Sequence, residues 1–582
     1  MITMGMVGLV RIMKEEVEMT DFGVNIDKEI LEKLPKNFFD YMVNQYDVAE
    51  RDYERLKNYF SYAGNKKYFK QNMTNIRNLM KGQLDKIKKY FPEEEATQNI
   101  QKTLEQVKKI KDFDQVSEVS ELIEDYYKNA KLEKINDKLT TNFFKTSVLR
   151  PLYGQPSFLN VAKNKLTKEE QINEFYKDYV QPAILELELL DRLEKEEDAE
   201  NIKQFLRDNN DYPPFKQILK VVKKKDLEGV NNYIKNELPK CTFIDELFAT
   251  GNYEEMIFSP LGISSLNFSW NLNRNQPVPI SALAKLILFL APAGAAFYYR
   301  REGHVNQRES RLYAGFVMSN DPFQEIYRQN NHFQKLKKEG NPFDEVIVDL
   351  LQETKERAKK VVKQLFFIEF YAEYESKKTL LDYYHMPLYV AKYFSEYGDK
   401  LSYIGGRNYR EEFTRAVLSG INPKNIVYKY LREVIENNYS AIGVYIAARE
   451  LNRIQSLKKG VSDMKKEDKK VFVVFKQGQE LRNRLIQVSQ GSGGVEDEQG
   501  TGGDKKINAL AYRLLNSSKA GNKKGFMDTI FRIHMNTGKE VSPIFLNALH
   551  EEELSFETIA SAFIAGMLSP ERENEKEAVT NE

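Results

Sequence analysis

Apolar residues recur every three or four positions along most of this chain, which is the spacing of an amphipathic α-helix. Residues 1–150 alternate in this way between aromatic and charged positions, as in FFDYMVNQYDVAERDYERLKNYF. Residues 168–240 show the same spacing, with a turn at 211–214. Residues 320–455 show it again, with strong apolar faces around VVKQLFFIEFYAEY and NYSAIGVYIAAREL. The pattern predicts a protein built mainly from helices.

The last part of the chain predicts a bundle of short helices. Leucines within 510–515 and apolar residues within 526–533 predict two helices, which Gly521 and Gly538 end. Ser542, followed by a proline, is typical of a further helix start.

A final helix is predicted between Ser555, as its N-cap, and Pro570, which ends it. Small side chains recur within this helix and would allow another backbone to approach closely: Ala560, Ala562, Ala565 and Gly566. The sequence therefore predicts tight packing of this helix against a neighbour.

Three segments interrupt the helical pattern. Residues 149–164 contain two prolines and a glycine and predict a loop, after which Thr167 and Glu170 form the pattern of a capping box. Residues 241–311 include a stretch rich in Asn, Ser, Pro and Gly, and their short apolar runs predict strands and loops. The run SQGSGGVEDEQGTGGDK (489–505) predicts a flexible loop or linker.

The fold class that follows is α+β, mainly α, with a mixed N-terminal domain, a middle rich in loops and strands, and a C-terminal helical bundle. At 582 residues the chain is too long for one simple core. We place the domain boundary between residues 1–455 and 456–582. Within the first domain, residues 168–240 form a helical arm and residues 241–311 form a recognition region.

Charge and cysteine usage restrict the function classes. The chain has 87 basic and 86 acidic residues, so contact with nucleic acid must come from local positive patches. The one cysteine, Cys241, excludes an internal disulfide and a multi-thiolate zinc site, which indicates a reducing cytoplasm. The uncharged run from Leu286 to Tyr299 is shorter than the ~20 residues that span a bilayer, so no membrane association is expected.

The chain carries no recognisable catalytic pattern. Phosphate-binding glycine loops, zinc-protease motifs and nucleophile elbows are all missing from the sequence, and its five histidines are scattered. We therefore predict no catalytic residues, no metal ligands and no cofactor.

The run LNFSWNLNRNQPVPIS (266–281) is the strongest candidate for recognition. Asn, Gln and Arg side chains can pair with the edges of bases, and an indole ring can stack or wedge between them. The alternative is an Asn-rich turn with the tryptophan in the core. The candidate nucleic-acid-binding residues in this run are Asn267, Trp270, Asn271, Asn273, Arg274, Asn275 and Gln276.

Residues 66–91 (KKYFKQNMTNIRNLMKGQLDKIKKYF) predict a positive helix face beside aromatic residues. Lys66, Lys67 and Lys70 are its candidate phosphate contacts, although an ordinary solvated face is the alternative. Two further basic clusters, at 216–225 and 458–476, are weaker candidates.

A third candidate is the turn GQPSFLN, in which glycine lets the backbone approach a phosphate and polar side chains can form hydrogen bonds. A plain structural turn is the alternative. Its candidate residues are Gly154, Gln155, Ser157 and Asn160. Arg300 and Arg301, next to Tyr298 and Tyr299, add cationic and aromatic groups near the recognition run.

Three phrases in this order resemble a known family. They are MGMVGLVRIMKEE at the start, GNYEEMIFSPLGISSLNFSWN with PVPISALAKLILFLAPAGAAFYYR in the middle, and the C-terminal run ending in ETIASAFIAGMLSP. They resemble the large subunit of type I-B CRISPR Cascade, the Cst-type family. Many relatives carry paired C-x-x-C motifs where this chain has only Cys241, so local packing is expected to replace the metal here.

The resemblance implies a non-catalytic large subunit of a crRNA-guided surveillance complex in a prokaryotic cytoplasm. It would recognise the protospacer-adjacent motif in target double-stranded DNA and promote strand separation and R-loop formation. It would contact the crRNA and the backbone, 5′-handle and small subunits of Cascade, and would recruit a helicase-nuclease. The alternatives are a metal-dependent nuclease or a helical scaffold that binds only protein. The family also implies that the C-terminal bundle can be made separately, and Met464 is a plausible internal start.

Overall fold

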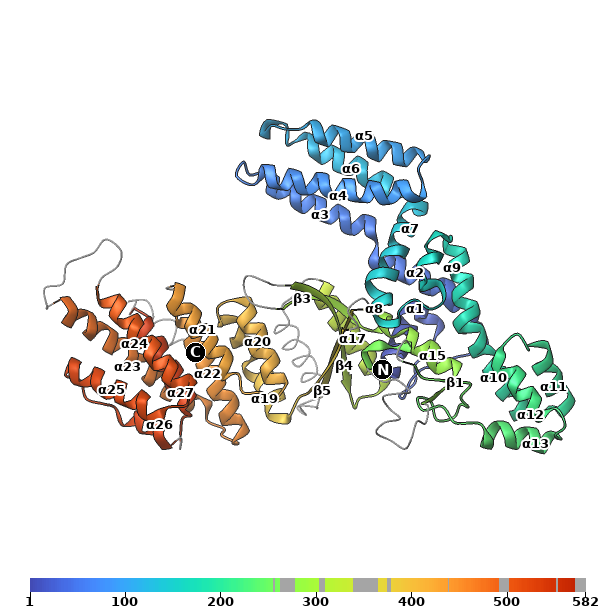
Figure 1. Ribbon diagram of the computed structural model, residues 1–582. Helices are drawn as coiled ribbons and strands as arrows, with labels where there is room; N and C mark the ends of the chain where they lie inside the picture. Colours follow the sequence, from blue (N-terminus) through green and yellow to red (C-terminus); the bar gives the residue numbers. More distant parts are fainter. Residues whose placement is uncertain are drawn as a thin grey trace. The chain divides into compact units, whose positions relative to one another are not determined.

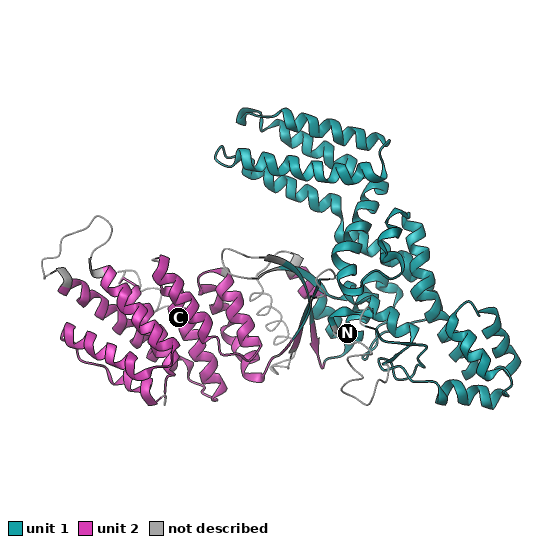
Figure 2. Cartoon of the chain, in the orientation of Figure 1, with its two compact units in different colours: residues 1–316, 321–330, 369–382 teal, residues 317–320, 331–368, 383–582 magenta. Residues whose placement is uncertain are grey.

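In the computed structural model, the described residues are 1–254, 257–261, 278–302, 309–338, 365–373, 378–437, 439–490, 502–550 and 553–570. The fold is α+β and mainly α, as the hydrophobic pattern predicts, with a small antiparallel sheet (Figure 1). The chain forms two compact units (Figure 2). Unit 1 comprises residues 1–316, 321–330 and 369–382, and unit 2 comprises residues 317–320, 331–368 and 383–582.

Unit 1 contains most of the helices that the N-terminal pattern predicts, together with three described α-helices in the segments 149–164 and 241–311, where loops or strands were predicted. They are α1 (Ile2–Met13), α2 (Lys28–Tyr46), α3 (Val48–Ala63), α4 (Phe69–Tyr90), α5 (Glu95–Lys109), α6 (Glu118–Ala130), α7 (Glu133–Phe144), α8 (Arg150–Tyr153), α9 (Lys168–Phe175), α10 (Gln181–Glu194), α11 (Ala199–Asp208), α12 (Pro213–Val222), α13 (Leu227–Asn232), α15 (Ala282–Phe289) and α16 (Ala291–Gly294).

The centre of unit 1 is the packing of α1 against α15 and α16. The backbones approach so closely that a Cβ atom on Gly8 would lie 2.2 Å from the carbonyl oxygen of Leu290. The buried guanidinium of Arg11 donates to the carbonyl oxygens of Ala293 at 2.9 Å and Asn330 at 2.7 Å. Arg11 thus binds a carbonyl group of α16 that this short helix leaves unpaired.

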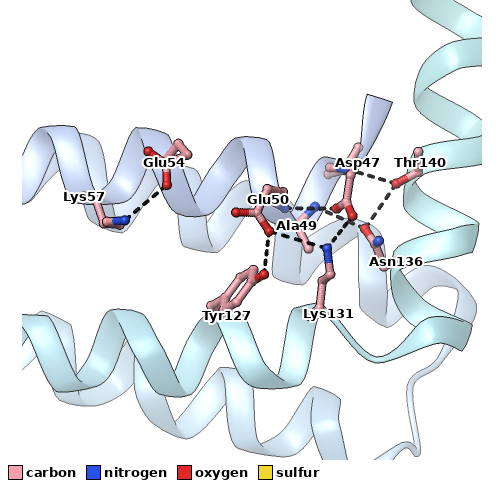
Figure 3. Close-up of polar contacts among 10 residues, drawn as sticks. Asp47, Ala49, Glu50, Glu54, Lys57, Tyr127, Lys131, Asn136 and Thr140 are labelled. Carbon is pink, nitrogen blue, oxygen red and sulfur yellow. Dashed lines mark hydrogen bonds and ion pairs between the residues drawn. The ribbon is translucent and has the colours of Figure 1, made fainter. Parts of the chain in front are cut away.

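Helices α3 to α6 form a four-helix bundle with its own apolar core. The first turn of α3 is capped partly from α7, as Figure 3 shows. The amides of Val48 and Ala49 donate to Thr140 Oγ1 at 3.0 Å and to Asn136 Oδ1 at 3.1 Å. The amide of Glu50 donates to Asp47 Oδ1 at 3.0 Å. Side chains therefore satisfy three of the amides that a helix start leaves unpaired.

The arm predicted at 168–240 is helical and has a separate core formed by α10 to α13. Thr167 and Glu170 form the predicted capping box at the start of α9, with both hydrogen bonds present. The loop predicted at 149–164 is wrong in its first residues. A π-helical turn over Lys145–Leu149 continues directly into α8, whose second residue is Pro151.

The sheet contains the largest departure from the predicted elements. Its order is β3 (Ala296–Glu302), β4 (Glu309–Ser319), β5 (Leu365–Glu373) and β6 (Lys378–His385). The helical pattern predicted around VVKQLFFIEFYAEY is wrong where LFFIEFYAE forms β5. Aromatic and branched residues dominate this run, and they favour a pleated surface over a helix. Helix α17 (Phe323–Lys338) follows β4.

The C-terminal helices of unit 2 follow the predicted bundle closely. They are α19 (Leu388–Tyr397), α20 (Arg407–Leu418), α21 (Lys424–Asn437), α22 (Ile442–Lys458), α23 (Met464–Gln490), α24 (Gly502–Lys519), α25 (Lys523–Thr537), α26 (Asn547–His550) and α27 (Phe556–Leu568). Ser555 caps α27 through the amide of Thr558 at 3.3 Å, and Gly538 ends α25 in the left-handed conformation. The turn after Ser542 is a 3-10 helix, Pro543–Leu546.

Helix α27 lies at the centre of this bundle and contacts α21, α22, α23 and α24. Of the small residues predicted to allow close approach, Gly566 does so, and Gly478 of α23 meets it from the other helix. A Cβ atom on Gly566 would lie 2.0 Å from the carbonyl oxygen of Phe475, and one on Gly478 would lie 2.3 Å from that of Phe563. The α23–α27 crossing therefore depends on glycine in both helices.

The glycine-rich run 489–505, predicted to be a flexible loop or linker, is partly helical. Helix α23 continues to Gln490 and α24 begins at Gly502, so both ends of the glycine-rich run 489–505 are helical, and residues 491–501 lie outside the described residues. The domain boundary predicted between residues 455 and 456 falls inside α22, whereas the compact units divide between residues 316 and 383.

Among the described helices, none combines the length and the apolar character needed to cross a membrane.

Candidate nucleic-acid interface

The recognition run predicted at 266–276 lies outside the described residues, which include neither Asn267, Trp270 and Asn271 nor Asn273, Arg274, Asn275 and Gln276. The described chain on both sides of it is well fixed. Strand β1 (Gly251–Asn252) pairs with β2 (Pro279–Ile280), and the amide of Tyr253 donates to the carbonyl oxygen of Val278 at 2.7 Å. The chain therefore leaves this ladder and returns to it at adjacent positions.

Glu186 on α10 holds both sides of this ladder. Its buried carboxylate accepts hydrogen bonds from the Thr250 hydroxyl, from the Ala282 amide at 2.8 Å and from the Tyr212 hydroxyl at 2.7 Å. Burial raises the pKa of Glu186 to about 7, although the three hydrogen bonds act in the opposite direction. The sequence did not single out Glu186, because one carboxylate within ILELELL resembles a solvated position.

Cys241 lies against the same ladder. Its buried sulfur accepts hydrogen bonds from the amide of Ser281 at 3.3 Å and from the Ser281 hydroxyl at 3.4 Å. Ser281 also caps α15 through the amide of Ala284. Within the described part of the chain, no cluster of three or more His, Cys, Asp or Glu side chains could hold a metal ion. Cys241 thus packs as a structural residue at the start of α15.

Helix α4 and the turn before it carry a row of exposed lysines. None of them forms an ion pair with a described carboxylate: Lys66, Lys67, Lys70, Lys81, Lys86, Lys88 and Lys89. The opposite side of the helix is fixed in the bundle, where Arg77 donates to the carbonyl oxygens of Val107 and Ile110. The predicted positive face is thus free to meet an anionic surface. Some other exposed lysines of unit 1 are paired, such as Lys57 with Glu54 and Lys33 with Glu29.

The turn at 154–160 combines fixed and available groups. Gly154 is buried and has φ of 69°, a conformation that favours glycine. The Ser157 hydroxyl donates to the Glu174 carbonyl oxygen at 3.3 Å, and the Asn160 side chain accepts from the amide of Ala162 at 2.9 Å. These two side chains stabilise the turn itself. Gln155 is half-buried, and its amide has no hydrogen-bond partner among the described residues.

The turn forms one wall of a groove of about 630 Å³ in unit 1. One wall comes from residues 146–161 and the other from strands β3, β4 and β5. The groove brings Gln155 together with Tyr299 of β3, whose side chain is 70% exposed. We call this hollow the loop–sheet groove.

Arginines and aromatic residues surround the loop–sheet groove. Arg150 donates to the Leu159 carbonyl oxygen at 2.9 Å and to Asn164 Oδ1 at 2.9 Å, which fixes the turn. The Arg311 guanidinium lies 5.3 Å from the ring centre of Tyr371, a cation–π arrangement. The β5 residues of this site could not be placed from the sequence, because their segment was predicted to be helical.

The other residues predicted near this site differ in their surroundings. Arg300 and Arg301 lie in β3, paired in register with Arg311 and Ser310, and their side chains lie outside the described structure. Tyr298 is buried, and its hydroxyl donates to the buried carboxylate of Glu369 at 2.5 Å. Of the two adjacent tyrosines, only Tyr299 is exposed to a ligand.

A larger hollow of about 940 Å³ lies among α2, α7, α9 and the end of α4. Its charges are mostly balanced internally. Lys168 pairs with Asp40 at 2.9 Å and with Asp137 at 2.8 Å, and Lys134 pairs with Glu94. This hollow therefore offers less to an anionic ligand than the α4 face does.

Comparison of the chain with models of known protein families and with curated proteins finds no match.

Proposed function

We propose that this protein is the non-catalytic large subunit of a crRNA-guided type I-B Cascade surveillance complex. In this role it recognises the protospacer-adjacent motif in target duplex DNA, promotes strand separation and recruits a helicase-nuclease. Its partners are the crRNA and the backbone, 5′-handle and small subunits, in a prokaryotic cytoplasm. Guide pairing then supplies sequence specificity, and the protein needs only to read a short motif and to hold DNA.

The observation that carries this proposal is the unpaired lysine row of α4. In a chain whose net charge is +1, seven exposed lysines without acidic partners form a local positive face. Such a face suits a polyanion, because each neutralised phosphate releases a counterion. The recognition run at 266–276 supplies the candidate motif contacts, and the β1–β2 ladder pairs the described chain before it with the described chain after it.

The test measures binding of target duplex and random duplex by the protein assembled with guide RNA and its sister subunits. Replacing Lys66, Lys67 and Lys70 together by alanine should weaken both complexes by about 10- to 30-fold and lower the salt dependence. Replacing Arg274 or Asn273 by alanine should weaken motif-dependent binding more than random binding.

The matched control replaces Lys33, Lys57 and Lys195 by alanine, which changes the net charge equally. These exposed lysines pair with Glu29, Glu54 and Asp191, so little loss of DNA binding is expected. Equal losses with both triple variants would contradict a specific role for α4. An assembled complex that ignores target duplex would end the proposal. Metal-dependent cleavage of DNA by the isolated chain would favour a nuclease instead.

A further inference from the structure

The loop–sheet groove has an exposed aromatic ring on an otherwise covered strand face. Phe297, Tyr299, Leu312 and Ala314 line the groove, and all but Tyr299 are buried or half-buried. The registers Phe297↔Ala314 and Tyr299↔Leu312 place these four residues on one face of the β3–β4 pair. Ligand pockets are typically lined by apolar and aromatic side chains together with a few polar groups, and this lining has that character.

The opposite wall presents a polar group that the fold itself leaves unused. Gln155 has one amide oxygen and one amide nitrogen, and neither forms a hydrogen bond with a described residue. The backbone around Gln155 is held from both sides, since Gly154 is buried before it and the side chains of Phe158 and Leu159 are fully buried after it. The amide is therefore presented from a fixed turn, with donor and acceptor side by side.

The size and charge of the groove limit what can enter. A hollow of about 630 Å³ takes a small planar group and its attached sugar. Arg150 and Arg311 line it together with one carboxylate, Glu373, so positive charge outnumbers negative charge in its lining. In a duplex each base is stacked and paired, and a base must leave the stack to enter such a pocket.

We propose that the loop–sheet groove binds one unpaired nucleobase of a single-stranded nucleic acid. The ring of Tyr299 stacks on the base, and the amide of Gln155 forms hydrogen bonds with its edge. This inference rests on the proposed function, because strand separation is what supplies unpaired bases. It goes further by assigning the single strand, and not the duplex, to this site.

The experiment uses the full-length chain and fluorescence anisotropy with fluorescein-labelled (dT)20 and a labelled 20-base-pair duplex. Tyr299→Ala should weaken (dT)20 binding by about tenfold, because stacking on one aromatic ring contributes roughly 1–3 kcal/mol. Tyr299→Phe keeps the ring and should retain the affinity. Duplex binding should be unchanged in both variants. Tyr439→Ala, at another exposed tyrosine, is the matched control and should have no effect.

A second readout concerns the edge of the base. Gln155→Ala should reduce the difference in affinity between (dA)20 and (dT)20, whereas a purely structural role for Gln155 would leave that difference unchanged. Circular dichroism of each variant checks that it remains folded.

The outcomes separate the two proposals. Unchanged (dT)20 binding by Tyr299→Ala overturns the base pocket, and so does an equal loss for single strand and duplex. In both cases duplex binding by the wild type leaves the proposed function intact. Failure of the wild-type chain and its assembled complex to bind any of these probes overturns the proposed function and the base pocket together.

Discussion

At the scale of single residues, polar groups in this protein divide into those that the fold uses and those it leaves available. The turn at 154–160 contains both kinds, since Ser157 and Asn160 stabilise the turn while Gln155 has an unused amide. The sequence identified all three but could not separate them. Hydrogen bonds to Glu174 and Ala162 decide between the two roles, and they depend on geometry that residue type does not contain.

Glu186 gives a residue-scale prediction about pH. Its pKa is raised to about 7 in the folded protein, above the unfolded value near 4.5. The folded state therefore holds this proton more tightly, and the contribution of Glu186 to stability falls as pH rises from about 4.5 to 7. Glu186→Gln cannot ionise and should lose this dependence. Relative to that of the wild type, the variant's free energy of unfolding should rise by about 2–3 kcal/mol between pH 5.0 and 7.5.

The measurement is urea unfolding of both proteins at several pH values. Other titrating groups cancel in the difference between wild type and variant, so the trend of that difference reports Glu186 alone. A difference that stays constant from pH 5.0 to 7.5 would show that the carboxylate is not destabilised by burial.

At the scale of elements, helix ends were easier to predict than strands. Thr167, Ser555 and Gly538 act locally, through a few neighbouring backbone groups, so their roles follow from short sequence patterns. Strand β5 was missed because a strand is stabilised by partners distant in the sequence. The loop–sheet groove could not be predicted for the same reason, because its walls come from residues 146–161 and from β3 to β5, which are distant in the sequence.

The α23–α27 crossing provides an element-scale prediction. Gly566→Ala would place a methyl group 2.0 Å from the carbonyl oxygen of Phe475, so the helices must separate. We expect the free energy of unfolding to fall by about 3 kcal/mol, which calorimetry would measure as a lower unfolding temperature. Gly82→Ala in α4 is the control, because open space surrounds that position. It should raise stability by up to about 1 kcal/mol through helix propensity. Equal effects of the two substitutions would argue against a tight crossing.

At the scale of the whole molecule, acidic and basic residues are nearly equal in number, but their charges are distributed unevenly over the surface. The net charge of +1 excluded a uniformly basic protein, and the sequence also located the lysines of α4. It could not show that those lysines lack acidic partners while Lys57 and Lys33 have them. Such pairing depends on which helix faces lie together, so only the folded chain reveals where positive charge remains available.

Met464 gives a whole-molecule prediction. Helix α23 begins at Met464, so an internally started product of about 120 residues would begin at a helix start. Such a product would lack α21 and α22, which cover part of α27 in the full chain. We expect it to be recovered in an assembly and not as a free monomer. Intact-mass spectrometry and gel filtration of recombinant protein check this, and Met464→Leu should remove the product. Detection of only full-length chain from the unmodified gene would contradict the prediction.

The capping of α3 from α7 has a consequence for how this protein can change during evolution. The amides of Val48 and Ala49 depend on Thr140 and Asn136, which lie beyond the bundle that α3 opens. A recombination event that transferred only residues 48–130 to another protein would leave these amides without acceptors. The bundle can therefore be transferred with this capping intact only as a larger segment that includes α7, so we expect breakpoints of gene exchange after residue 140.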